Sequence, residues 1–113
     1  VETVSLAEDV SATLTLAQNA LLGEARGTNT VTLADAGVAS GAAQVENYQL
    51  ADGANTFTLG ASAQNVTGGT GDDHFKSGSL TSIEGSLDGG DGDNTLTVEH
   101  DASLTATLAN IAS

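Results

Sequence analysis

The sequence predicts an all-β fold: a parallel β-solenoid (β-roll or β-helix) of about five irregular coils with glycine–Asx turns, formed by residues 1–113 as a single segment. Three observations support this prediction. A short motif recurs along the chain: glycine, any residue, Asn or Asp, any residue, then a large apolar residue. Each copy alternates apolar and polar positions, as the two faces of a β-strand require. Threonine is abundant and proline is absent, a composition that favours strands.

The five copies of the motif give the main series of predicted strands. Successive copies are 17, 26, 18 and 21 residues apart, and a step near eighteen suits a coil with two short strands. Copies in equivalent places would stack their apolar residues coil upon coil, and this stack is the predicted core. The copies begin at residues 10, 27, 53, 71 and 92, and the first of them has lost its glycine. The stacked residues are Leu14, Val31, Phe57, Phe75 and Leu96.

A second family of short strands is predicted for the other half of each coil. Its members are residues 4–6, residues 48–50, Val66 and residues 83–87. The alanine- and glycine-rich residues 35–44 form either one helical turn or a loop, and they account for the 26-residue step as an insertion. No helix is predicted elsewhere.

The charge of the chain excludes several classes of partner. Fifteen acidic residues stand against Arg26 and Lys76, which gives a net charge of −13. Nucleic-acid binding needs a cationic surface, so no nucleic-acid partner is expected. An anionic membrane surface is disfavoured for the same reason, and no run of eighteen apolar residues predicts direct membrane insertion. The chain contains no cysteine, which rules out disulfides and thiolate metal sites.

Two nonapeptides within residues 68–97 carry a recognisable pattern. Residues 68–76 (GGTGDDHFK) match Gly-Gly-x-Gly-x-Asp-x-apolar-x at every defined position. Residues 89–97 (GGDGDNTLT) match it except at Asn94, where the pattern has aspartate. The chain thus resembles the RTX-type calcium-binding β-roll repeats of large secreted bacterial adhesins and surface proteins.

The resemblance implies a Ca2+ site between successive glycine turns. In such repeats the turn supplies carbonyl oxygens and the sixth-position aspartate supplies a carboxylate. That makes Asp73 the principal ligand, whereas Asn94 offers a neutral oxygen. The 21-residue step from Gly71 to Gly92 leaves open whether these two turns are in register. The predicted metal-site residues are Gly69, Gly71, Asp72, Asp73, Gly90, Asp91, Gly92, Asp93 and Asn94.

A metal-free alternative for the turns also follows from the sequence. Asn29 and Asn55 occupy the same place in the motif as Asp73, and Asn side chains stabilise such turns by hydrogen bonds to the backbone. For the coils of Asn29 and Asn55 we therefore expect a ladder of asparagines without an ion.

The predicted function is that of a non-enzymatic structural repeat in an extracellular fibre, surface layer or adhesin, secreted or at the cell surface. No sequence context arranges Ser, His and Asp as a catalytic triad, and the carboxylates of Asp91 and Asp93 lie on glycine turns that suit a metal better than acid–base chemistry. Neither end shows an evident polar cap: Val1, Val4 and Leu6 open the chain, and Leu104, Leu108 and Ile111 close it. Because solenoids need caps, we expect neighbouring repeats or copies of the chain to stack end to end.

The alternative prediction is a ligand-binding module. Outward-facing Thr and Asn residues would then form a flat surface for ice or a glycan. The threonines occur in pairs, and the pairs are Thr13/Thr15, Thr30/Thr32, Thr56/Thr58, Thr95/Thr97 and Thr105/Thr107.

Overall fold

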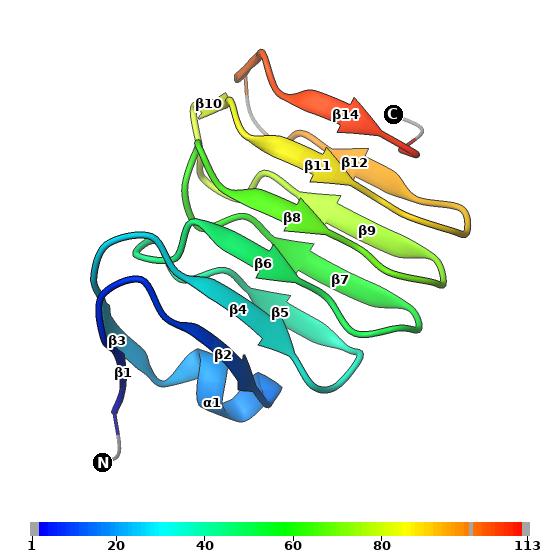
Figure 1. The fold of residues 1–113 in the computed structure, drawn as a ribbon. Helices are drawn as coiled ribbons and strands as arrows, with labels where there is room; N and C mark the ends of the chain where they lie inside the picture. The colour runs from blue at the N-terminus through cyan, green and yellow to red at the C-terminus, as the bar shows by residue number, and fades with distance from the viewer. Residues whose placement is uncertain (1–2, 100, 112–113) are drawn as a thin grey trace.

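The computed structural model describes residues 3–99 and 101–111, and within these ranges the chain is a parallel β-solenoid (Figure 1). About six turns stack along one axis, with almost no helix. The fold class predicted from the sequence is confirmed. Among the described residues no helix is long and apolar enough to cross a membrane.

The largest sheet has six strands in the order β14-β11-β8-β6-β4-β2. Each strand pairs with a strand one coil away, and the register steps are 19, 17, 18, 21 and 21 residues, from the N-terminal end to the C-terminal end. The coil is therefore close to the expected length but variable. The strands are β2 (Ser11–Leu14), β4 (Thr30–Leu33), β6 (Asn47–Gln49), β8 (Asn65–Thr67), β11 (Ser86–Asp88) and β14 (Thr107–Ala109).

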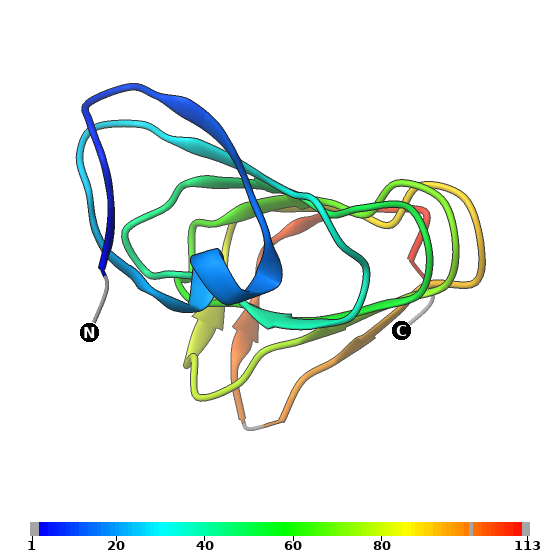
Figure 2. The same cartoon turned by 90° about the horizontal axis from the view of Figure 1, so that it is seen from below.

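A four-stranded sheet, in the order β12-β9-β7-β5, forms the opposite side of the coil. Two further parallel pairs, β1 with β3 and β10 with β13, lie outside the two large sheets. Figure 2 shows the coil viewed along the stack. The strands of the four-stranded sheet are β5 (Val38–Ser40), β7 (Asn55–Thr58), β9 (Asp73–Lys76) and β12 (Thr95–Thr97). The remaining strands are β1 (Val4–Leu6), β3 (Leu22–Ala25), β10 (Ser82–Ile83) and β13 (Ser103–Leu104).

Two apolar columns, one from each large sheet, form much of the core. The rings of Tyr48 and Phe57 meet between the sheets, with centroids 4.9 Å apart. The six-stranded sheet contributes Ala12, Val31, Tyr48, Val66, Leu87 and Leu108, and the four-stranded sheet contributes Ala39, Phe57, Phe75 and Leu96.

The prediction of a single apolar stack was therefore wrong. Val31 pairs with Ala12 and Tyr48 in the six-stranded sheet, whereas Phe57, Phe75 and Leu96 pair in the four-stranded sheet. The motif specifies a strand that follows a tight turn, and this local pattern is the same on both sheets. The 26-residue step marks the passage from one sheet to the other.

The second strand family was predicted in part. Tyr48, Val66 and Leu87 share the six-stranded sheet, but residues 4–6 pair with β3 instead, and Ile83 belongs to β10. The undecided residues 35–44 contain β5.

A short helix, α1 (Leu16–Ala20), was not predicted. It begins with a capping box, in which Thr15 Oγ1 accepts from the Gln18 N–H at 3.1 Å and Gln18 Oε1 accepts from the Thr15 N–H at 2.9 Å. The helix follows β2 and packs against β5, to which the Asn19 side-chain amide donates at Ser40 O, 2.8 Å away. The Tyr48 hydroxyl donates to Asn19 Oδ1 at 2.6 Å.

Helix α1 therefore covers the N-terminal edge of the four-stranded sheet. The expectation that both ends lack a cap was wrong for this sheet, because the capping-box signal lies inside a segment that also matches the strand motif. Val1, which also supported that expectation, lies outside the described residues.

Candidate metal centre

Three Asx residues stack at the corner where the chain passes from the six-stranded to the four-stranded sheet. We call Asn55, Asp73 and Asn94 the Asx ladder; all three side chains are buried. Asn55 Oδ1 accepts from the Gly37 N–H of the preceding turn at 3.1 Å, and Asn94 Oδ1 accepts from the Asp73 N–H at 2.7 Å. Each asparagine thus joins its own turn to the one before it.

Asn29 makes a similar bond, to the Val10 N–H at 3.0 Å, but at a different corner. It precedes β4, whereas Asn55 precedes β7 of the other sheet. The predicted ladder of Asn29 with Asn55 was wrong, because the two copies of the motif enter different sheets.

The amide nitrogens of the ladder point to carbonyl oxygens. Asn55 Nδ2 donates to Ala51 O at 2.8 Å, to Gly53 O at 3.1 Å and to Asp73 Oδ1 at 2.8 Å. Asn94 Nδ2 donates to Asn110 O of the following turn at 3.1 Å, with longer contacts to carbonyls of its own turn. The side-chain amide of an asparagine in the ladder therefore donates to several backbone carbonyls.

Asp73 breaks this pattern, because its second oxygen is an acceptor. The residue is only 1% exposed, and Oδ2 is buried without a hydrogen-bond partner. A Cβ built on Gly68 would lie 2.5 Å from Asp73 Oδ2 and 2.6 Å from Gly89 O. A Cβ on Gly89 would lie equally close to Asn94 Nδ2 and Asn110 O, at 2.5 Å from each. Asp73 Oδ2 thus lies at the place that the amide nitrogen takes in Asn94, close to the Gly89 carbonyl and without a hydrogen-bond partner.

The electrostatics of Asp73 follow from this geometry. Burial raises the pKa of the Asp73 carboxyl above its ordinary value, and the nearby carboxylates of Asp72 and Asp52 raise it further. Hydrogen bonds from Asn55 act in the opposite direction. A negative, oxygen-rich position of this kind is neutralised by a proton or by a hard cation.

The glycine turns on either side of Asp73 are in register, which answers the question raised by their 21-residue spacing. Phe75 pairs with Leu96, and the extra residues lie away from the turn, around β10. A Cβ on Gly90 would collide with Gly69 O, and one on Gly92 with Gly71 O, so only glycine permits this approach. All four glycines also have positive φ, between 69° and 95°.

The other predicted acidic ligands lie on the outside of the turns. Asp72, Asp91 and Asp93 are exposed, and Asp72 Oδ1 accepts from the Asp93 N–H at 2.7 Å. In the part of the chain that the structure describes, no group of three or more His, Cys, Asp or Glu residues is placed to hold a metal. The site consists instead of one carboxylate and several backbone carbonyls.

The structure thus brings together six of the predicted residues: Gly69, Gly71, Asp73, Gly90, Gly92 and Asn94. The sequence-based prediction missed the Gly89 carbonyl and the Asn55 amide. The paired glycines of the motif signalled the close approach at residues 68 and 89, but a backbone carbonyl leaves no mark in the sequence.

The threonine pairs do not form one array on the described strands. Thr13 and Thr32 are aligned in the six-stranded sheet, whereas the pairs of β7 and β12 lie in the other sheet. Between the latter, β9 places His74 and Lys76, and His74 Nε2 lies 2.6 Å from Thr97 Oγ1. This division does not favour an ice- or glycan-binding surface.

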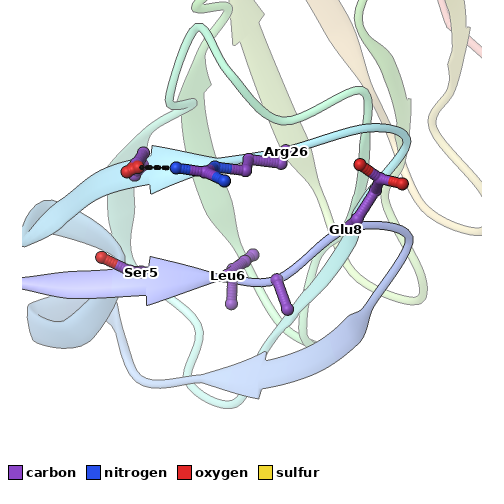
Figure 3. A pocket seen from close by; sticks show the side chains of 6 residues that line it. Ser5, Leu6, Glu8 and Arg26 are labelled. Atoms are coloured by element: carbon purple, nitrogen blue, oxygen red, sulfur yellow. Dashed lines mark hydrogen bonds and ion pairs between the residues drawn. The ribbon is translucent and has the colours of Figure 1, made fainter.

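A second concave feature lies between β1 and β3 (Figure 3). Its polar side chains are those of Ser5, Glu8, Glu24 and Arg26, and Arg26 Nη2 pairs with Glu24 Oε2 at 3.3 Å. Both partners of this ion pair are largely exposed, so it is worth little. The hollow is shallow and carries no buried titratable group among these residues, in contrast to the Asx ladder.

Comparison of the chain with protein-family models, with curated proteins and with solved structures gave no significant match. Function is therefore inferred from the geometry of the chain itself.

Proposed function

We propose that this chain is a non-enzymatic structural repeat of an extracellular fibre, surface layer or adhesin, stabilised by Ca2+ at the glycine turns of Asp73 and Asn94. One observation carries the proposal: Asp73 Oδ2 is buried without a hydrogen-bond partner, and a Cβ built on Gly68 would lie within 2.6 Å of both this oxygen and the Gly89 carbonyl oxygen. Ca2+ binds about six to eight oxygens at about 2.3–2.6 Å and accepts backbone carbonyls together with carboxylates. The donors at this corner, one carboxylate and backbone carbonyls, are of the type that Ca2+ binds.

The residues that would hold the ion come from two successive coils. Asp73 supplies the carboxylate, and carbonyls of its own turn, Gly69 and Gly71, correspond to those that Asn55 and Asn94 contact in theirs. The Gly89 carbonyl comes from the next coil. A cation there would link the coil of β9 to the coil of β12, so its role is structural.

The resemblance to RTX repeats supports an extracellular location, where Ca2+ is abundant. The net charge of −13 also supports this proposal, because a bound cation offsets part of the self-repulsion of the folded chain. A ligand that binds only the folded state raises the free energy of unfolding with the logarithm of its concentration once that exceeds Kd.

The test is thermal unfolding of the chain by far-UV circular dichroism, in chelator, in Ca2+ and in Mg2+. We expect Ca2+ to raise the melting temperature, chelator to reverse the change, and Mg2+ to have little effect because it demands a regular octahedral site with several waters. Asp73→Asn should abolish the response, and Asp72→Asn, on the exposed side of the same turn, should keep it. Identical melting in Ca2+ and chelator would reject the calcium site.

A further inference from the structure

Strand β8, in the interior of the six-stranded sheet, consists of the tripeptide Asn65-Val66-Thr67. An asparagine two residues before serine or threonine is the acceptor sequence for N-linked glycosylation in secreted proteins, unless proline lies between the two. The chain contains seven asparagines, and Asn65 alone has a serine or threonine two positions further on. The sequence therefore contains a single acceptor tripeptide.

The structure exposes both side chains that this tripeptide needs. Asn65 and Thr67 are exposed and Val66 between them is buried, because successive residues of a strand face opposite sides of the sheet. The amide and the hydroxyl thus lie on the same outer face, where a transferase can reach both. Most of the other asparagines are inaccessible, and the buried ones are Asn19, Asn29, Asn55 and Asn94.

The side-chain amide of Asn65 is hydrogen-bonded to the strands on both sides of β8, whose order is visible in Figure 1. Its Oδ1 accepts from the Ser86 N–H of β11 at 2.9 Å, and its Nδ2 donates to Asn47 Oδ1 of β6 at 3.0 Å. Within the described residues Nδ2 makes this one hydrogen bond, which uses one of its two hydrogens. A sugar on Nδ2 replaces one hydrogen and leaves the other to donate to Asn47.

The surface around Asn65 leaves room for a glycan. The outward residues beside β8 are Asn47, Gln49, Ser86 and Asp88, and none of them is aromatic or carries a long basic side chain. The Asx ladder is not on this surface, since the side chain of Asp73 is buried between the turns. A glycan on the outer face therefore leaves the candidate metal centre unchanged.

We propose that Asn65 is the attachment site of an N-linked glycan. The proposal rests on the extracellular location in the proposed function and extends that function by a modification site. In the transfer, Asn65 Nδ2 forms a bond to the anomeric carbon of an activated sugar, which is a nucleotide sugar or a lipid-linked sugar diphosphate. The bond from this carbon to the phosphate oxygen breaks, the phosphate leaves with the electron pair, and one amide proton passes to a base of the transferase.

Mass spectrometry of the protein purified from its own cells tests the proposal. Trypsin cleaves after arginine and lysine, and because Arg26 and Lys76 are the only such residues, it releases residues 27–76 as one fragment. We expect this fragment to carry the added mass of sugar units, and its fragmentation to place them on Asn65. A fragment with the mass of the unmodified sequence would overturn the proposal, and so would sugar found only on its serines or threonines.

Two substitutions of Thr67 separate the acceptor sequence from the exposed strand position. Thr67→Ser keeps the hydroxyl and should keep the glycan when the variant is produced in the same cells. Thr67→Val keeps the branched shape that suits a strand but has no hydroxyl, so the glycan should be lost. Circular dichroism checks that both variants fold. A glycan that persists on Asn65 in Thr67→Val would overturn the assignment to this tripeptide.

The calcium dependence of unfolding, measured on the same material, separates this proposal from the one on which it rests. An unmodified Asn65 in a chain that Ca2+ stabilises would overturn the glycan and leave the proposed function intact. A glycan on Asn65 in a chain that melts identically in Ca2+ and in chelator would support the modification and reject the calcium site.

Discussion

The backbone N–H of Asp73 donates a 2.7 Å hydrogen bond to Oδ1 of Asn94, which lies 21 residues further along the chain and one coil up the stack. Asn55 makes the equivalent bond to the Gly37 N–H one coil below. The Asx ladder therefore holds the coils together by side-chain oxygens that accept from the preceding turn. In Asp73 a carboxylate oxygen, which is an acceptor, takes the place of the amide N–H donor that Asn55 and Asn94 direct to backbone carbonyls.

Replacing Asp73 with asparagine restores that donor. Leaving a buried polar group without a partner costs about 1–3 kcal/mol. In chelator we expect Asp73→Asn to raise the free energy of unfolding by about this amount, because its Nδ2 would donate to the Gly89 carbonyl. Urea denaturation measures the change. Asp72→Asn serves as the control, since Asp72 is exposed and its change should be much smaller. If Asp73→Asn is instead less stable than the wild-type chain in chelator, the unpaired oxygen of Asp73 does not destabilise the metal-free chain.

The reverse substitution, Asn94→Asp, should create a second buried carboxylate oxygen that lacks a hydrogen-bond donor. Asn94 Nδ2 now donates to Asn110 O at 3.1 Å, and an aspartate would present an oxygen to that carbonyl. We expect Asn94→Asp to lower stability in chelator by about 1–3 kcal/mol and to recover part of the loss in Ca2+. Asn65→Asp, at an exposed strand position, is the matched change in charge. Equal loss in both variants would trace the effect to net charge instead of the ladder.

The stability of the calcium-free chain should depend on pH through Asp73. Burial raises the pKa of this carboxyl in the folded chain above its ordinary value of 3.8, so the folded state binds the proton more tightly than the unfolded state. The contribution of Asp73 to the free energy of unfolding is then fully present below the ordinary pKa and is lost as pH rises through the folded pKa. Asp88 acts in the opposite direction, because donors on Asn110 and Gly90 lower its pKa.

The contribution of Asp73 is isolated by comparing the wild-type chain with Asp73→Asn. In chelator, the advantage of the variant should be small at low pH and should grow as pH rises through the folded pKa of Asp73. Melting temperatures measured between acidic and neutral pH provide the test. A difference that does not change with pH would contradict the assignment of the effect to ionisation of Asp73.

Much of the fold could be predicted because its signals are local. Alternation within each motif copy predicted β7, β9 and β12, and the glycines that precede them predicted the turns. The allocation of strands to sheets could not be predicted, since Val31 and Phe57 occupy identical motif positions but pair in different sheets. Helix α1 was missed for a similar reason: Thr15 ends a strand-like copy and also caps a helix.

The candidate site shows the same limit. The motif identified Asp73 as the acid between two glycine turns, because its type and spacing carry that information. It did not show that Oδ2 lacks a partner or that the Gly89 carbonyl lies close to it, since both depend on how two coils 21 residues apart stack.

Gly68 allows a test of the space around the carboxylate. A Cβ there would lie 2.5 Å from Asp73 Oδ2 and 2.6 Å from Gly89 O, and so would occupy the position between the two oxygens. Overpacking of a buried site costs about 1–3 kcal/mol. We therefore expect Gly68→Ala to lower the melting temperature and, because the methyl group displaces the cation, to weaken stabilisation by Ca2+.

Gly23→Ala is the matched control for this variant. Its Cβ would meet only the methyl end of the Thr3 side chain, at 2.6 Å, and Gly23 is exposed, so the neighbour can move away. Gly23→Ala should retain the full calcium response. If Gly68→Ala also kept the wild-type calcium shift, the ion would have to bind elsewhere, because a methyl group and a cation do not fit together between Asp73 Oδ2 and the Gly89 carbonyl.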